Sequence, residues 1–218
     1  MGDEINSDIN CRLCKQTFSP RKITNHLKSC KEYHSQGGVK DVFLIKAGVD
    51  HFWVYFELET KLTLEDLDQF FRDLWVECCG HLSAFTIERV PYTSSKHSPD
   101  EKSMNIPLNK VIQPKSKFSY EYDFGSTTMI YVECISLEKG NEGIHIIARN
   151  NLPEIKCNKC GSIAEEICSQ CIDEGLGFLC KGCAKKHECG IDILLPVVNS
   201  PRLGICGFTG YDCPLIDK

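Results

Sequence analysis

Residues 157–189 read CNKCGSIAEEICSQCIDEGLGFLCKGCAKKHEC, and their cysteine spacing predicts how this segment folds. Three Cys-x-x-Cys pairs begin at Cys157, Cys168 and Cys180, and they are followed by His187 and Cys189. Two thiolates at this spacing hold one tetrahedral metal ion from a tight turn. Eight such ligands are the number that two zinc ions need. We therefore expect the segment to be organised by two zinc ions rather than by a large apolar core.

The order of these pairs resembles cross-brace modules such as the B-box and MYND classes, in which alternate pairs share an ion. By this analogy the first zinc is held by Cys157, Cys160, Cys180 and Cys183, and the second by Cys168, Cys171, His187 and Cys189. A sequential arrangement is the alternative, and Cys206 or Cys213 could replace Cys189. Closed four-ligand sites leave no position for water, so we expect structural zinc ions. The resemblance also implies that the module docks a protein.

A second ligand pattern lies near the N-terminus and consists of Cys11, Cys14, His26 and Cys30. It approximates the two-cysteine, two-histidine finger, with Cys30 in place of the last histidine. Ser19-Pro20 is typical of a helix start, and a helix from there would place His26 and Cys30 on one face. So short a segment folds only with its metal, which brings the expected number of zinc ions to about three.

The finger is strongly basic. Between residues 11 and 31 there is no acidic side chain, while six positions are cationic: Arg12, Lys15, Arg21, Lys22, Lys28 and Lys31. Such a charge pattern is typical of proteins that contact phosphates, so we expect DNA or RNA as a partner of the finger. The alternatives are a docking surface or a merely solvated face.

The cysteine content also indicates a compartment. The 218 residues include 15 cysteines, an odd number, and the acidic start of the chain does not resemble a secretory signal. We therefore expect reduced thiols and a cytoplasmic location. Because no run approaches about 18 apolar residues, we expect no membrane contact. Cys78, Cys79 and Cys134 lie in apolar patterns, so we expect them to be small buried hydrophobic side chains.

The middle of the chain, between the two cysteine-rich parts, has the periodicity of an α+β core. Residues 39–46, 51–59, 81–92, 117–124, 127–137 and 144–149 are strand-like. Residues 63–79 form the main helix, since Leu64, Leu67, Phe71 and Trp75 recur at helical spacing behind a capping Thr63. This order predicts an α+β fold: an antiparallel or mixed sheet with one main helix, flanked by small zinc-binding modules.

Three segments of this core resemble one family. The segment FSYEYDFG at residues 118–125, the helix start TLEDL at 63–67 with the strand HLSAF at 81–85, and the tail LPVVNSPRLGICG at 195–207 are similar to the plasmid ORF-three-like family, also called the insertion-element passenger TnpR-like family. The resemblance covers roughly residues 39–210 and implies an α+β fold and a link to mobile elements, but no established activity. Many members follow Asp-Phe-Gly with Asp, Trp and His, where this chain has Ser126, Thr127 and Thr128.

No catalytic arrangement is recognisable. The chain has no nucleophile paired with a base at a known spacing, no serine-recombinase site and no glycine-rich phosphate loop. We therefore expect a non-enzymatic zinc-binding interaction protein. It would have a finger and linker at 1–36, the core at 37–152 and the two-zinc module with its tail at 153–218. The alternative is an enzyme with a site between the core and the C-terminal module that uses Cys206 or Asp123.

Overall fold

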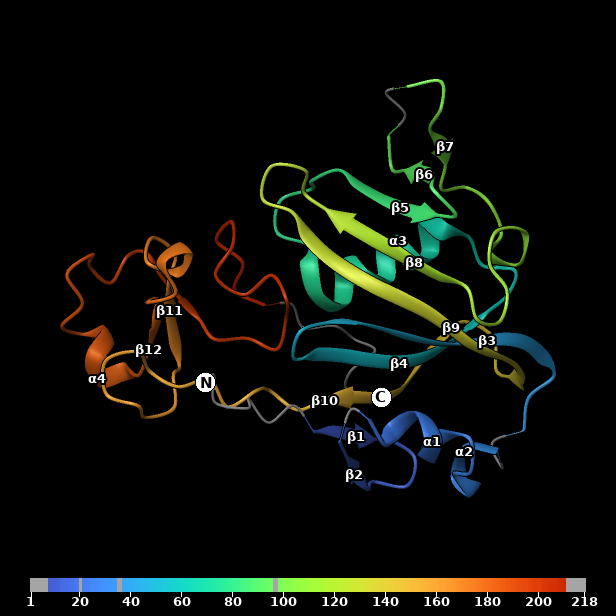
Figure 1. Cartoon of the computed structure of the whole chain (residues 1–218), viewed down its shortest axis with the longest axis horizontal. Coiled ribbons are helices and arrows are strands. Elements are labelled where there is room, and N and C mark those ends of the chain that lie inside the picture. The colour runs from blue at the N-terminus through green and yellow to red at the C-terminus, as the bar shows by residue number, and fades with distance from the viewer. Residues whose placement is uncertain (1–7, 20, 35–36, 96–97, 211–218) are drawn as a thin grey trace.

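The computed structural model describes residues 8–19, 21–34, 37–95 and 98–210 (Figure 1). Within these ranges the fold is mixed α+β, as expected, and is built on a ten-stranded sheet in the order β2-β1-β10-β4-β3-β9-β8-β5-β6-β7. Neighbouring strands are antiparallel, except that β6 and β7 are parallel. The strands are β1 (Ile9–Cys11), β2 (Thr17–Phe18), β3 (Lys40–Val49), β4 (Phe52–Glu59), β5 (Ser83–Ile87), β6 (Val90–Thr93), β7 (Lys102–Ser103), β8 (Lys117–Tyr122), β9 (Thr128–Gly140) and β10 (Ile144–Asn150).

The main helix covers one face of this sheet, as Figure 1 shows for α3 behind β8. α3 (Leu64–Phe71) begins at the predicted cap: Thr63 and Asp66 each bond the other's backbone N–H. It continues as a π-helical turn, η1 (Arg72–Val76), and a short 3₁₀ turn, η2 (Leu108–Lys110), follows later in the chain. Together, α3 and η1 bury aromatic side chains in the main apolar core.

Several helices and strands differ from the predicted ones because of the local backbone conformation. The segment 81–92 is a hairpin rather than one strand, because Glu88 and Arg89 both have positive φ, at 50° and 68°. The helix stops at Val76 instead of Cys79. The strand β8 ends at Tyr122, two residues before the predicted end, since Asp123 has φ 64°. Phe124 therefore lies outside the strand and is exposed.

The finger region is part of the central sheet. β1 pairs with β10, with Ile9 opposite Asn150, and β2 pairs with β1. The short helices α1 (Ile23–Leu27) and α2 (Lys31–His34) follow. Ile23 and Leu27 of α1 are buried in a second apolar cluster, which includes Tyr55 of β4. Tyr33 is buried in α2, so this part of the predicted finger and linker is folded.

The C-terminal module is a small separate sheet, at the left of Figure 1. It contains β11 (Glu166–Cys168), β12 (Phe178–Leu179) and β13 (Leu194–Pro196) in the order β12-β11-β13. A 3₁₀ turn, η3 (Ile172–Glu174), and a one-turn helix, α4 (Lys181–Ala184), complete it. β13 is an edge strand, as Pro196 predicts. The fully buried apolar cluster of this module has only four members, and two of them are cysteines: Cys157, Cys168, Leu179 and Ala184.

Candidate metal centres

Four groups of cysteine and histidine side chains come together in the described part of the chain. In each group the four potential ligand atoms lie within 4.8 Å of one another. Three groups are those that the spacing predicts: Cys11, Cys14, His26 and Cys30; Cys157, Cys160, Cys180 and Cys183; and Cys168, Cys171, His187 and Cys189. The fourth was not predicted and consists of Cys78, Cys79, His81 and Cys206. The groups are therefore compatible with metal binding.

The finger group is built by a turn and a short helix. The backbone N–H of Lys15 donates to the carbonyl of Cys11 at 2.9 Å, which closes the Cys-x-x-Cys turn. His26 lies on α1, where Phe18 stacks on its ring with a 3.9 Å centroid separation. Its Nε2 is 3.3 Å from Cys14 Sγ. Pro20 lies outside the described residues, and α1 begins at Ile23, later than the predicted helix start.

The two C-terminal groups interleave along the chain. The first Cys-x-x-Cys pair joins the third, and the second pair joins His187 and Cys189, which is the cross-brace order rather than the sequential one. The thiols of Cys160 and Cys180 are 3.6 Å apart, and Cys171 Sγ is 3.5 Å from His187 Nε2 and 3.7 Å from Cys189 Sγ. The fourth member of the second group is therefore Cys189, and Cys206 does not replace it. Cys213 lies outside the described residues.

These separations fit a tetrahedral ion. Zinc bonds of about 2.3 Å to sulfur and about 2.0 Å to nitrogen place two sulfur ligands about 3.8 Å apart, and sulfur and nitrogen about 3.5 Å apart. The sulfurs are also too far apart for disulfides, which need about 2.05 Å, and the cysteines of all four groups are free thiols. Thiolates with imidazole, in closed groups of four, favour zinc among common metals.

Backbone N–H donors lower the pKa of one thiol in each C-terminal group. Burial alone would raise the pKa of Cys157, but N–H groups of Cys180, Lys159 and Cys160 outweigh it and lower this pKa to about 6. Cys168 follows the same pattern, with burial opposed by backbone donors, and its pKa falls to about 7. Each of the two C-terminal groups therefore contains one thiol that ionises near neutral pH. The ionised form, the thiolate, is the one that binds a metal.

The fourth group corrects our interpretation of Cys78 and Cys79. Cys134 is fully buried, as expected, but Cys79 is exposed and Cys78 only half-buried. Both side chains meet Cys206, which comes from a turn more than 120 residues later in the chain. Sequence spacing could not reveal this group, because its members are distant along the chain. The closely spaced Cys78, Cys79 and His81 were the only local signal.

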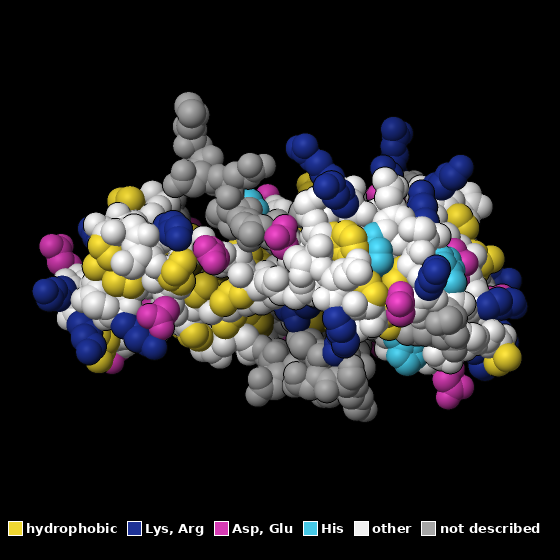
Figure 2. All heavy atoms as spheres, turned by 90° about the horizontal axis from the view of Figure 1, so that it is seen from below, with side chains coloured by type: hydrophobic (Ala, Val, Ile, Leu, Met, Phe, Trp, Pro, Cys, Tyr) yellow, Lys and Arg dark blue, Asp and Glu magenta, His cyan; other side chains and the backbone are white. Residues whose placement is uncertain are grey.

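Most cationic side chains of the finger are exposed to solvent. α1 turns Ile23 and Leu27 inward, so its flanking cations face solvent. Arg12 is half-buried, and the other five are exposed: Lys15, Arg21, Lys22, Lys28 and Lys31. Figure 2 shows lysine and arginine side chains extending from the half of the molecule that carries the finger.

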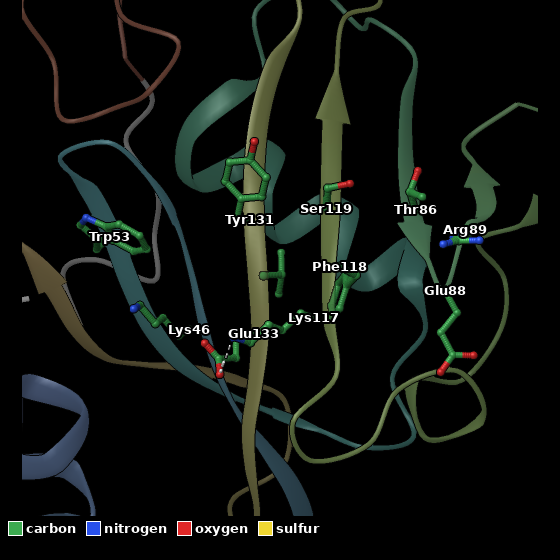
Figure 3. A pocket seen from close by; sticks show the side chains of 11 residues that line it. Lys46, Trp53, Thr86, Glu88, Arg89, Lys117, Phe118, Ser119, Tyr131 and Glu133 are labelled. Carbon is green, nitrogen blue, oxygen red and sulfur yellow. Dashed lines mark ion pairs between the residues drawn. The ribbon is translucent and has the colours of Figure 1, made fainter. Parts of the chain in front are cut away.

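A groove of about 570 Å³ lies beside the finger on the sheet (Figure 3). Trp53 and Tyr131 line it, together with Lys46, whose Nζ is 4.6 Å from the Trp53 ring centre. Trp53 and Tyr55 are two residues apart on β4 and share a face, and Tyr55 contacts the finger through Thr24 at 2.9 Å. The groove and the finger are therefore on one face of the sheet.

The residues of the enzyme alternative do not line this groove. Asp123 accepts a 2.6 Å hydrogen bond from Arg202, which lowers the pKa of Asp123, and Cys206 belongs to the fourth group. Both side chains are thus engaged with other protein groups.

Comparisons with known proteins identify no family. No family model matches the chain, and no curated protein is similar to it. Among solved structures, a protein of unknown function from Methanosarcina mazei Go1 is similar at 17% identity, over 50% of this chain and 68% of that chain, with a TM-score of 0.43. The resemblance to the plasmid ORF-three-like family stays a prediction. In the described residues, no helix is both long and apolar enough to cross a bilayer.

Proposed function

We propose that this chain is a non-enzymatic, zinc-stabilised interaction protein that holds nucleic acid on the sheet face carrying the finger. The proposal rests on one observation: the exposed cations of the finger and the aromatic groove lie on the same face. Zinc in the finger would be structural, because four protein ligands leave no position for a substrate. Its role would be to hold α1 so that Arg21, Lys22 and Lys28 face outward.

The groove favours a single strand as the ligand. Proteins that bind single-stranded nucleic acid combine cations that follow the phosphates with aromatic rings on which bases stack. Tyr131 is 61% exposed, and Arg89 and Lys117 also line the groove. Lys117 is paired with Glu133 at 3.7 Å, so we expect Arg21, Lys22 and Lys28 of the finger to supply most of the phosphate contacts.

The charge test compares two triple variants that change the net charge equally. Replacing Arg21, Lys22 and Lys28 by Glu should reduce affinity for a labelled single-stranded oligonucleotide and lower the salt slope by roughly 2 units, since each phosphate contact contributes about 0.7. The control replaces Lys61, Lys110 and Lys115, which are exposed on the core, and should change both much less. Fluorescence anisotropy over a salt series measures both quantities.

The stacking test uses single substitutions in the same assay. Tyr131→Ala should weaken binding by about 1–3 kcal/mol if a base stacks on this ring. Phe124→Ala is the matched control, because Phe124 is also about half exposed but does not line the groove. If neither DNA nor RNA binds at low salt, the proposed function is wrong; tighter binding of a duplex than of a single strand would contradict the role of the groove.

A second proposed contact, with a protein, involves the C-terminal module. Ile163, Leu176 and Ile191 are large apolar side chains that are 45–69% exposed, and Figure 2 shows apolar side chains on this half of the molecule. A contiguous exposed apolar patch is typical of a docking surface, and docking here requires the three side chains to form one. A double variant, Leu176→Asp with Ile191→Asp, should lose a partner that the wild-type chain retains in pull-down from its host, at unchanged metal content. Equal recovery by both chains would argue against docking here.

A further inference from the structure

We infer that Cys78, Cys79, His81 and Cys206 form a fourth metal site, of the zinc type, which ties the segment 199–208 to the core. This goes beyond the three zinc ions of the proposed function and does not depend on nucleic-acid binding. Its ligands come from two places. Three lie between η1 and β5, and Cys206 lies in a turn after β13.

The ligand atoms are arranged like those of the predicted groups. Cys79 Sγ is 3.7 Å from both Cys78 Sγ and Cys206 Sγ. His81 Nε2 is 3.0 Å from Cys79 Sγ and 3.3 Å from Cys206 Sγ. Three sulfurs and one nitrogen, at separations near those of a tetrahedral zinc, form a complete ligand set. No disulfide joins these cysteines.

The protein holds the first three ligands in place. Arg72 donates to Glu77 at 2.6 Å and to the carbonyl of His81 at 2.8 Å, so it spans both ends of the loop. The Tyr122 hydroxyl accepts the backbone N–H of His81 at 3.2 Å and that of Cys78 at 3.4 Å. The loop is therefore ordered by polar contacts that involve no ion, as expected of a prepared site.

The segment that carries Cys206 is held independently. Ser200 donates to the carbonyl of Trp75 at 2.6 Å. Arg202, fully buried, donates to Asp123 at 2.6 Å and to the carbonyl of Ser126 at 3.1 Å. Cys206 itself has φ 52°, a left-handed conformation that costs a non-glycine residue about 1 kcal/mol. A bond from its sulfur to a metal would offset that cost.

The surrounding charges also suit a cation with thiolates. Three thiolates and one Zn²⁺ carry a net charge of −1, and Asp123, whose Oδ2 is 3.5 Å from His81 Nε2, adds another negative charge. Arg202 Nε lies 3.3 Å from Cys78 Sγ and places a buried positive charge beside the group. Metal-bound thiolates are commonly stabilised by such donors.

Metal content is the first test. Purified zinc-saturated protein should contain four zinc ions per chain, and Cys206→Ser should contain three. Cys134→Ser is the control, because Cys134 is a cysteine in the described residues that belongs to none of the four groups; it should keep four. A wild-type content of three, or a content of four in Cys206→Ser, would overturn the inference.

Alkylation of the wild-type chain gives a test that needs no variant. Cys79 and Cys206 are exposed, so iodoacetamide should label them rapidly unless a metal holds them. In zinc-saturated protein both should be protected, and after chelation both should react, as read by peptide mass spectrometry. Rapid labelling of these two in zinc-saturated protein, with the other three groups protected, would refute the fourth site and leave the three predicted sites unaffected.

Hydrogen exchange tests the proposed tie. Amides of residues 203–208 should exchange at least tenfold faster in Cys206→Ser than in wild type, both zinc-saturated. Unchanged exchange, with one zinc lost, would show that Arg202 and Ser200 suffice to hold the segment. None of these measurements uses nucleic acid, so failure of the fourth site and failure of the proposed function are distinguishable.

Discussion

Arg202 is a buried cation whose guanidinium donates to three residues at the turn between β8 and β9. Besides Asp123 and the carbonyl of Ser126, it donates to Thr128 Oγ1 at 3.1 Å, and its guanidinium lies 4.9 Å from the Tyr122 ring centre. A buried charge costs several kcal/mol unless it is paired and hydrogen-bonded. Removing one partner of Arg202 is therefore expected to cost more free energy than that single contact contributes.

Removing the carboxylate partner should reveal this cost. We expect Asp123→Ala to lower the free energy of unfolding by about 3 kcal/mol, because Arg202 stays buried without its counter-charge. Asp41→Ala is the matched control: Asp41 also pairs with a cation, Lys139 at 2.7 Å, but both side chains are more than half exposed, so we expect about 0.5 kcal/mol or less. Urea unfolding of zinc-saturated proteins measures both. Equal losses would contradict the buried-pair explanation.

Glu57 should make stability depend on pH. Burial raises the pKa of Glu57, although the Tyr33 hydroxyl, which donates to it at 2.8 Å, acts in the opposite direction. A carboxyl with a raised folded pKa binds protons more readily when folded. Its contribution to stability is therefore largest at low pH and is lost as pH rises from about 4.5 through the folded pKa.

Glu57→Gln should remove this dependence. The variant should be more stable than wild type at pH 7. This difference in stability should shrink as the pH falls below the pKa of Glu57 in the folded chain. Comparing the two chains cancels the loss of metal that acid causes in both. Thermal unfolding between pH 5 and 8 measures the difference, with the exposed Glu142→Gln as control. A constant difference across this range would argue against a raised pKa.

At the scale of elements, α3 is the part that its own sequence specifies most completely. Thr63 accepts from the N–H of Asp66 at 3.2 Å, and Asp66 accepts from the N–H of Thr63 at 2.7 Å. This reciprocal cap can be read from the sequence because both residues are local. The far end of the helix cannot, since the chain leaves the helix after Val76 to place Cys78 and Cys79 beside Cys206.

The cap offers an element-scale prediction. Thr63→Ala should lower the free energy of unfolding by about 1 kcal/mol, because the first turn of α3 loses its acceptor. The control is Thr127→Ala, an exposed threonine outside the helix, which should change it by less than 0.5 kcal/mol. Denaturant unfolding distinguishes the two. A cap variant as stable as the control would mean that tertiary packing alone holds the start of α3.

Turns with unusual backbone conformation account for the other missed elements. Glu88 and Arg89 turn the chain between β5 and β6, although neither is a residue type that normally signals positive φ. Asp123 similarly ends β8. The pattern of alternating side chains predicted the strands themselves, and the short-range cysteine spacing predicted three ligand groups. What the pattern missed depends on residues that meet only in the folded chain.

At the scale of the whole molecule, the central sheet and the C-terminal module differ in what stabilises them. The main core has more than thirty buried residues, most of them from α3 and the sheet, and it also includes Ile155, Ala164, Ile167 and Leu203 from the C-terminal region. The separate buried cluster of the C-terminal module has only four residues, two of them cysteines. We expect a module with so small an apolar cluster of its own to depend on bound metal ions for stability. We do not expect this of the central strands β3, β4 and β9.

Chelation should therefore act selectively. After removal of metal at neutral pH, amides of β11, β12 and β13 should lose hydrogen-exchange protection, while those of β3, β4 and β9 keep most of theirs. Mass spectrometry of peptides from both regions measures this, and zinc added back should restore the lost protection. Uniform loss across the chain, or no loss at all, would contradict this division.

The pairing of β1 with β10 affects how the chain is made. Ile9 leaves the ribosome roughly 140 residues before its partner Asn150, which corresponds to on the order of ten seconds of translation. All four cysteine and histidine residues of the finger emerge within residues 11–30. The nascent chain can thus bind a metal ion in the finger first, with β1 and β2 already formed. The strand β10, the last of the ten-stranded sheet along the chain, then pairs with β1.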